Sequence, residues 1–447
     1  MIKRFILLLV LLSTPFLGKA QKETNKSPLS IKGVLGSRYI STHNRGELAD
    51  FNALIGQGML KASYKAKPWL KFSAQFNGVY IPFKDGLLRV DAATGSGPIY
   101  EGNLWNDRLM SGNTQFSLPV LNAELEFKSQ FLTLGRFTKE SPIINPEPWP
   151  FPNAMEGVWY ENYSAESTSW QLGIIRRIAP RFSGAFEVVG ESIGVGATGV
   201  DFDGNTAQYR GQIDAGLMLI ANVQQQLNEK ASINLWNYFV PNVTNTFIAE
   251  SKLHLADPAI NISGMAIVQN RLGDGGNAAE SLTYQRDDLA LYLGLRLEKH
   301  LEKDVFQMNL SRISADGRLL LPREWGREPF YTFQRRTRVE GASDVWAIML
   351  KWQRSWVTDK SLYRFFTSIG KNKMPLATDY PRNKYTLPSH VHWDASLRYQ
   401  PIAGDGKITA EIYLAYRFLA EDIHTNYNVL INRADFFHAD IIFNYNF

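Results

Sequence analysis

The sequence predicts an all-β transmembrane barrel of about eighteen antiparallel strands, with short periplasmic turns and long extracellular loops. Three observations predict this fold: an N-terminal export signal, long segments in which apolar and polar residues alternate, and short connections that alternate with long ones. We expect residues 1–20 to be a cleaved signal peptide, residues 21–30 a short periplasmic segment, and residues 31–447 the barrel.

The export signal begins with Lys3 and Arg4, continues through an apolar run at residues 5–17, and ends near Gly18 and Ala20. This is the layout of a secretory signal peptide. Removing its three cations lowers the formal net charge from +5 to +2, and no run of like charge indicates a nucleic-acid partner. The absence of cysteine excludes a disulfide scaffold, a thiol nucleophile and a cysteine zinc site.

The alternation is clearest at residues 69–80, 391–399 and 407–418. In the first segment Phe72 and Phe76 alternate with Ser73 and Gln75. Successive side chains of a strand point to opposite faces, so each segment has one apolar and one polar face. A soluble sandwich would show the same alternation. The segments are longer than the usual ~5–6 residues of globular strands, which favours the barrel.

Connections of two kinds alternate along the chain. Short turns are expected at residues 65–68, 128–130, 163–166, 225–230, 256–259, 300–304, 358–361 and 402–406. Longer loops are expected at residues 43–49, 82–113, 140–153, 180–210, 241–245, 271–280, 315–343, 371–389 and 420–432. These connections join eighteen strands and place both termini on the periplasmic side, which agrees with the even strand number of bacterial barrels.

The last strand places Phe443, Tyr445 and Phe447 on one face, and the sequence stops at this phenylalanine. An aromatic terminal residue after an amphipathic strand is similar to the signal that the barrel-assembly machinery recognises. The alternative is an edge strand of a secreted sandwich, where such a row of exposed aromatics would promote aggregation. We therefore predict that these three residues form the assembly signal.

Residues 140–153 contain five prolines, which makes this loop stiff and unable to extend a sheet. We expect Pro146, Pro148, Trp149 and Pro150 to form a constriction loop folded into the lumen. A rigid surface loop is the alternative.

Residues 315–343 are rich in arginine. The arginines are Arg318, Arg323, Arg327, Arg335, Arg336 and Arg338, and they are accompanied by Glu324, Glu328 and Glu340. A guanidinium matches carboxylate and phosphate groups geometrically, and such groups in a narrow pore would select anions. In an outer loop the same arginines would instead pair with the glutamates and with lipopolysaccharide phosphates.

Short motifs resemble those of the OprD-type outer-membrane porins. They are Leu-Gly-Arg-Phe at residues 134–137, the proline-rich loop, Glu-Gly-Val at 156–158, Trp-Gly-Arg-Glu at 325–328, and Glu-Gly at 340–341 followed by Asp344. The resemblance covers nearly the whole mature chain in outline. It implies an eighteen-stranded monomeric barrel that imports small solutes, mostly with a carboxylate.

The resemblance also implies a ladder of basic residues on the barrel wall opposite an acidic patch. Arg323 and Arg327 match this pattern. By alternation, the polar face of its strand is expected to carry each of Arg177, Arg364, Arg398 and Arg417. The pattern does not decide whether Arg136 points into the barrel or toward the membrane. The predicted solute pathway comprises Arg323, Arg327, Arg335, Arg336, Arg177, Arg364, Arg398, Arg417, Asp394 and Glu411.

We do not expect the protein to be an enzyme, and we expect neither a cofactor nor a metal site. Residues 190–194 match G-x-S-x-G, but no helical segment follows to form the strand-to-helix turn that this motif needs. Residues 201–205 suggest a calcium loop but lack the downstream glutamate.

The predicted function is passive uptake of small hydrophilic solutes, anionic or zwitterionic, through an outer-membrane channel. The expected partners are outer-membrane lipid, lipopolysaccharide and the barrel-assembly machinery. The alternatives are a barrel for hydrophobic solutes and a barrel that binds capsule or surface polysaccharide.

Overall fold

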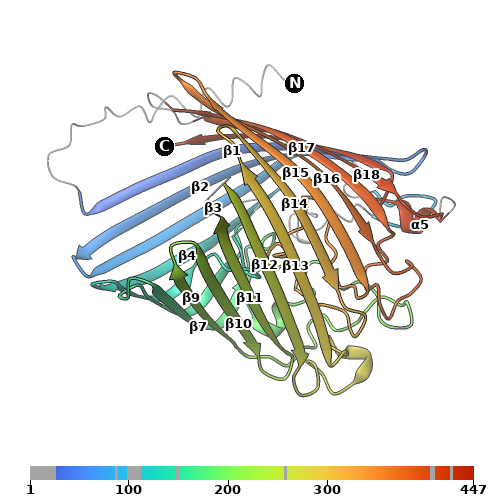
Figure 1. The fold of residues 1–447 in the computed structure, drawn as a ribbon, viewed down its shortest axis with the longest axis horizontal. Helices are drawn as coiled ribbons and strands as arrows, with labels where there is room; N and C mark the ends of the chain where they lie inside the picture. The colour runs from blue at the N-terminus through green and yellow to red at the C-terminus, as the bar shows by residue number, and fades with distance from the viewer. Residues whose placement is uncertain are drawn as a thin grey trace.

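The computed structural model describes residues 27–85, 89–97, 112–146, 151–255, 259–402, 408–422 and 426–447. Its strands form one antiparallel sheet that closes on itself (Figure 1). The strands are β1 (Leu29–Asn44), β2 (Phe51–Lys67), β3 (Leu70–Asp85), β4 (Thr114–Phe127), β5 (Gln130–Phe137), β6 (Ala154–Asn162), β7 (Thr168–Ala179), β8 (Glu187–Val188), β9 (Met218–Asn228), β10 (Ala231–Val240), β11 (Thr244–Leu255), β12 (Ile260–Arg271), β13 (Leu289–His300), β14 (Asp304–Ile313), β15 (Val345–Val357), β16 (Ser361–Lys373), β17 (His390–Pro401), β18 (Ile408–Leu419) and β19 (Phe436–Asn446). Three single-turn helices, α4 (Val189–Ser192), η1 (Glu280–Leu282) and α5 (Tyr427–Leu430), lie in connections.

The barrel wall has eighteen strands, as the sequence predicted. β8 has only two residues and pairs with the end of β7, while β7 pairs directly with β9 from Thr168–Gln225 to Ile175–Met218. The wall therefore consists of β1–β7 and β9–β19. No described helix combines the length and the apolar character that crossing a membrane requires.

Apolar side chains face outward and polar side chains face inward. On β3, Phe72 and Phe76 are 46% and 48% exposed, whereas Ser73, Gln75 and Asn77 are buried. A soluble sandwich would bury the phenylalanines and expose the polar residues. This arrangement is that of a barrel wall in lipid and confirms the predicted fold class.

All eight predicted short turns connect the expected strand pairs, from β2–β3 to β17–β18. Several loop predictions were wrong in extent. The connections after β7 and β12 continue to residues 217 and 288, beyond the predicted 210 and 280. The connection after β10 comprises only residues 241–243, so it is as short as a turn. β3 continues to Asp85 past Pro82, because the register shifts between Leu54 and Gly56, and proline is tolerated at such a bulge.

β1 and β19 close the barrel. Their register runs from Val34–Asn446 to Asn44–Phe436, and the backbones of Gly33 and Phe447 exchange two further hydrogen bonds of 2.8 and 2.9 Å. Closure leaves no sheet edge with unpaired backbone groups in the membrane. The residues of the predicted assembly signal are exposed on the outer face. Their role in assembly stays a prediction.

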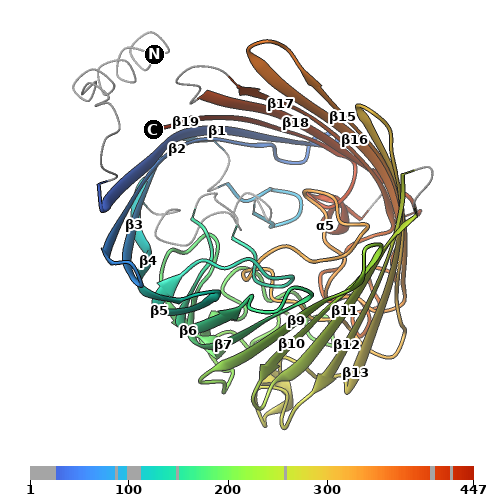
Figure 2. The ribbon, with the colours of Figure 1, turned by 60° about the vertical axis from the view of Figure 1, so that its left-hand side comes forward.

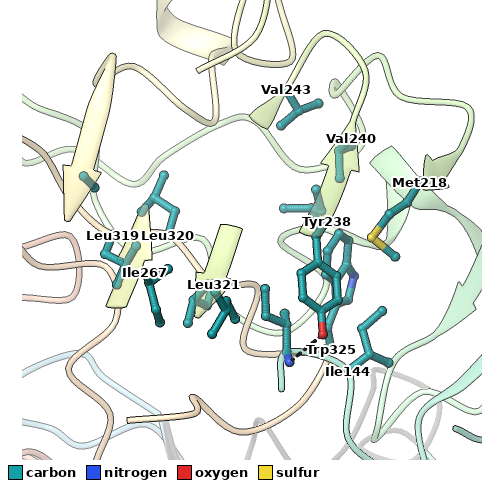
Figure 3. Close-up of a cluster of buried hydrophobic side chains, with 14 of the residues drawn as sticks. Ile144, Met218, Tyr238, Val240, Val243, Ile267, Leu319, Leu320, Leu321 and Trp325 are labelled. Carbon is teal, nitrogen blue, oxygen red and sulfur yellow. Dashed lines mark hydrogen bonds between the residues drawn. The ribbon is translucent and has the colours of Figure 1, made fainter. Parts of the chain in front are cut away.

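A hydrophobic cluster fills part of the barrel interior (Figure 3). Met218, Tyr238 and Val240 contribute from the wall, while Ile144 and Trp325 contribute from long loops. Figure 2 shows these loops inside the ring of strands. Residues 1–26, which include the predicted signal peptide, are outside the described residues.

Candidate functional site

The loop between β14 and β15, residues 314–344, folds into the barrel. The Leu320 N–H donates to Gln269 Oε1 on β12, and Gln269 Nε2 donates to the Leu320 carbonyl, each at 2.8 Å. Further along, the Tyr331 hydroxyl donates to Glu250 Oε1 on β11 at 2.8 Å. The first half of the loop is thus attached to the β11–β12 wall from inside.

Residues 331–337, which we call the strap, run along the inner face of the wall from β11 toward β19. After Tyr331 and Thr332, which contact β11, β13 and β14, the strap meets the wall through four pairs: Gln334–Ser368 at 2.9 Å, Arg335–Glu411, Arg336–Asp440 at 3.4 Å and Thr337–His390 at 3.0 Å. Because the strap lies on the inner face of the wall, it narrows the bore.

Four charged residues of the inner wall lie in one row across β1, β19, β18, β17 and β16. The register pairs Arg38 with Ile442, Ile442 with Glu411, Glu411 with Arg398, and Arg398 with Arg364. Directly paired residues share one face of a sheet. Since barrel strands tilt by ~35–45°, the row runs obliquely along the bore and sets its charges at successive depths.

The members of this row differ in their partners. Arg38 Nη2 lies 2.7 Å from Asp440 Oδ2, and Glu411 pairs with Arg335 of the strap. Arg398 and Arg364 are exposed and make no hydrogen bond or ion pair with other residues in the described part of the chain. Two guanidinium groups thus face the open bore without a carboxylate partner.

Sequence reasoning missed an aromatic platform beside the strap. The Lys351 ammonium lies 4.9 Å from the centroid of the Phe366 ring, and the Arg335 guanidinium lies 5.9 Å from it. Arg335 also lies 5.0 Å from the Tyr413 ring. Ile348 and Leu350 face outward on β15, so the alternation of faces places Lys351 inward. The sequence pattern could therefore have identified Lys351 as a residue that faces the bore.

Two predicted pathway residues lie beneath the strap rather than at the open bore. Arg417 is fully buried and donates to the carbonyls of Arg433, at 2.8 Å, and Arg336. Asp394 is 2% exposed and accepts hydrogen bonds from Ser368, from Gln334 at 3.3 Å and from Tyr413 at 3.2 Å. The prediction that Arg417 lines the pathway was wrong in position, because two loops cover it.

Arg177 lies on the outer face, against the prediction. Glu156 pairs in register with Arg177 and Gly157 with Ile175, so Arg176 is an extra bulge residue that reverses the alternation. Arg136 shares this face, since its register partner Leu121 is 51% exposed. Glu156 pairs with both arginines, at 2.7 Å to Arg136 and 3.8 Å to Arg177. This triad is remote from the bore.

The proline-rich loop and the arginine-rich loop meet at Arg327. The Arg327 N–H donates to Asn145 Oδ1 at 2.9 Å, Asn145 Nδ2 donates to the Arg327 carbonyl at 3.1 Å, and Asn153 donates to the Trp325 carbonyl. The Arg327 side chain is exposed. Arg323 instead pairs with Glu340 and stacks over the Tyr385 ring at 3.4 Å.

The proline-rich loop also turns inward. Ile143, Ile144 and Phe151 are buried, and Phe151 packs against wall residues of β1–β3. Pro146 belongs to the described part of this loop, whereas Pro148, Trp149 and Pro150 are outside the described residues.

Buried carboxylates hold the arginine-rich loop in shape. Glu328 accepts the N–H groups of Val339 and Glu340 at 3.0 and 2.9 Å, and burial raises the pKa of Glu328 to about 7. Glu324 accepts the Gly194 N–H, and burial raises its pKa to about 6. The loop that carries the strap is therefore fixed by internal bonds.

The two weak motifs have structural roles. Ser192 of the G-x-S-x-G match is fully buried, donates to the Val189 carbonyl at 2.7 Å and accepts from Trp325 Nε1 at 2.8 Å. Asp201 Oδ1 accepts the N–H groups of Asp203 and Asn205, each at 2.9 Å, which shapes a turn. Within the described residues no group of acidic and histidine side chains could hold a metal ion.

Solved structures with this architecture are numerous, whereas no family model and no curated protein matches the sequence. Acinetobacter baumannii OccAB4 aligns with a TM-score of 0.66 and 11% identity over 94% of this chain and 98% of its own. Pseudomonas aeruginosa OccK8 (OprE) aligns with a TM-score of 0.67 and 10% identity over 94% and 98%. P. aeruginosa OccK2 (OpdF), solved in complex with glucuronate, aligns with a TM-score of 0.65 and 11% identity over 94% and 96%.

The P. aeruginosa outer membrane protein opdK shares the same fold, with a TM-score of 0.63 and 11% identity over 94% of this chain and 98% of its own. The alignments cover nearly the full length of both chains. The chain thus has the eighteen-stranded barrel fold of the Occ/Opd outer-membrane proteins, which is the fold expected from its resemblance to the OprD-type porins.

Proposed function

We propose that the protein is an outer-membrane channel for passive uptake of small hydrophilic solutes that carry a carboxylate. The observation that carries this proposal is the row of Arg38, Glu411, Arg398 and Arg364 on the inner wall, which leads obliquely past the strap. A carboxylate that passes the strap meets guanidinium groups at successive depths and is never far from a positive charge.

The narrow bore makes these charges effective. A pair of unit charges 4 Å apart interacts by about 1 kcal/mol in bulk water and about 4 kcal/mol at an effective dielectric of 20. The strap and the inward loops exclude part of the water, which moves the interaction toward the larger value. Arg364 and Arg398, which have no carboxylate partner in the described part of the chain, are the residues best placed to contact a solute.

Two alternatives receive less support. A channel for hydrophobic solutes would need an apolar path, whereas the apolar side chains of the interior cluster are buried against one another. A polysaccharide-binding barrel would present its arginines outward, whereas the strap arginines face Glu411 and Asp440 inside the bore.

The outer wall suits the expected membrane partners. The exposed apolar residues on the outer face of the wall would contact outer-membrane lipid. Lipopolysaccharide would surround the end of the barrel that carries the long loops. Assembly by the barrel-assembly machinery would depend on Phe443, Tyr445 and Phe447.

A flux assay in liposomes tests the proposal. Glucuronate and glucose are matched probes, since they have nearly the same size and differ by one carboxylate. We expect wild-type protein to pass glucuronate faster, and the double variant Arg364→Ala/Arg398→Ala to lose most of this preference. The variant Arg177→Ala is a matched control, because it removes an arginine from the outer face and should change nothing. Equal ratios in the wild type and the double variant would contradict the proposal.

A further inference from the structure

Arg318 is one of two arginines of the long loop, the other being Arg338, that the predicted solute pathway does not include. It lies at the loop end of the barrel, 3% exposed, with its guanidinium 4.0 Å from the Phe202 ring. Its Nε and Nη1 atoms are buried and make no hydrogen bond with the described residues. The carboxylate of Asp287 lies 3.8 Å from Nε, beyond hydrogen-bond distance. Burial lowers the pKa of Arg318 to about 10.

A second buried cation, Lys384, lies beside the same cavity. It is 2% exposed, and its ammonium lies 4.6 Å from the Tyr209 ring and 4.6 Å from the Tyr284 ring. Among the described residues the ammonium has no hydrogen bond and no ion pair. Burial lowers the pKa of Lys384 to about 7.

The cavity between these cations has a volume of about 20 Å³. About 10–15 Å³ is needed to hold one water molecule, so there is room for one water or one monatomic ion. The lining comes from four loops: Val200, Asp201, Ala207, Tyr209, Glu280, Ser281, Thr283, Tyr284, Arg286, Arg318 and Lys384.

The carboxylates near the cavity are already engaged. Glu280 pairs with Arg286, and Asp201 Oδ1 accepts two N–H groups of its own turn. Asp287 Oδ2 accepts the backbone N–H of Arg318 at 3.0 Å. Arg318 has one long ion pair, 3.8 Å to Asp287. Lys384 has the buried Glu340 and Glu324 nearby but no ion pair among the described residues. A buried charge is costly unless it is closely paired.

We propose that this cavity binds a single monatomic anion of chloride size, held by Arg318 and Lys384. The anion would pair with both cations and join the loops after β7, β12, β14 and β16. The Lys384 backbone already links two of these loops to its own, because it donates to the Gly341 carbonyl at 3.0 Å and accepts from Val200 at 2.8 Å. The bound anion would thus stabilise the layer from which the strap extends.

Crystals soaked in sodium bromide test the site directly by anomalous scattering. We expect one peak in the cavity of the wild-type protein and no peak there in Lys384→Met or Arg318→Gln. Absence of the wild-type peak, with only a water in the cavity, or a peak that persists in both variants, would overturn the proposal. The heat-modifiable mobility of each variant establishes that its barrel is assembled.

Hydrogen exchange provides a second readout in solution. At equal ionic strength, potassium chloride should slow exchange of the Val200 and Lys384 amides relative to potassium methanesulfonate, whose anion is too large for the cavity. At a chloride concentration ten times the dissociation constant, the opening equilibrium should fall about elevenfold. Chloride should not slow exchange of these amides in Lys384→Met. In the wild-type protein the amides of β15 should exchange at the same rate in both salts. Equal exchange in the two salts would overturn the proposal.

Discussion

Replacing Arg335 with alanine should shift the ion selectivity of the channel toward cations. Around the strap, Arg335 and Lys351 stand near Glu411 and Asp394. Removing the guanidinium leaves Glu411 without its ion-pair partner beside the strap. The local formal charge of this group of four falls from zero to −1.

The size of the shift follows from the distance at which an ion passes. At about 8 Å from the centre of the pair, a unit charge gains or loses about 0.5 kcal/mol in water and about 2 kcal/mol at an effective dielectric of 20. Because an anion loses what a cation gains, the difference between the two changes by about 1 to 4 kcal/mol. This range corresponds to a change of about fivefold to about 700-fold in the anion-to-cation permeability ratio, because ~1.4 kcal/mol is tenfold.

Reversal potentials in planar bilayers measure this ratio. The matched variant Glu411→Gln removes the opposite charge of the same pair and should shift the ratio toward anions. The double variant Arg335→Ala/Glu411→Gln should return close to the wild type. The shifts of both single variants should shrink from 0.1 M to 1 M salt, as the screening length falls from about 10 Å to about 3 Å. Shifts of the same sign in both single variants, or none at 0.1 M salt, would refute the reasoning.

Three further outcomes are expected. Replacing Phe447 with aspartate should reduce the assembled, heat-modifiable protein in the outer membrane, because β19 must pair with β1 to close the barrel; normal levels would contradict this. Arg417→Met should increase single-channel noise and proteolysis of the strap, since Arg417 donates to the Arg336 carbonyl, whereas Arg177→Ala should behave as the wild type. Burial raises the pKa of Glu328 from 4.5 to about 7, so the folded loop binds a proton more tightly than the unfolded loop and gains stability as pH falls from 7 toward 4.5. Hydrogen exchange of the Val339 amide, corrected for intrinsic rates, should be slower at pH 5 than at pH 7, and Glu328→Gln should abolish this difference.

Alternation predicted the wall well, because membrane and lumen impose opposite demands on neighbouring residues. Phe72 and Ser73 lie on the faces that the pattern indicated, and Arg364 and Arg398 face the bore as expected. The position of Arg177 was wrong, since the single extra residue Arg176 reverses the alternation and leaves no mark in the local sequence. The alternation of residues assigns side chains to the inner or outer face reliably only within a stretch of strand that contains no bulge.

The direction of the long loops could not be predicted from their composition. Arginine and glutamate in residues 315–343 suit an outer loop and an inward loop equally, and the choice depends on wall partners such as Gln269 and Glu250 that lie far away in the sequence. The burial of Arg417 has the same origin, because it is covered by the strap at Arg336 and by Arg433 of the loop before β19. Contacts between loops and wall decide which polar side chains meet the bore.

Single-channel recording of the wild-type protein in planar bilayers, under a salt gradient, tests the central claim most directly. A narrowed, water-filled barrel, in which Arg364 and Arg398 have no carboxylate partner among the described residues, predicts discrete conductance steps and a reversal potential on the anion-selective side. Absence of discrete steps from heat-modifiable protein, or a reversal potential on the cation-selective side at low salt, would contradict the account.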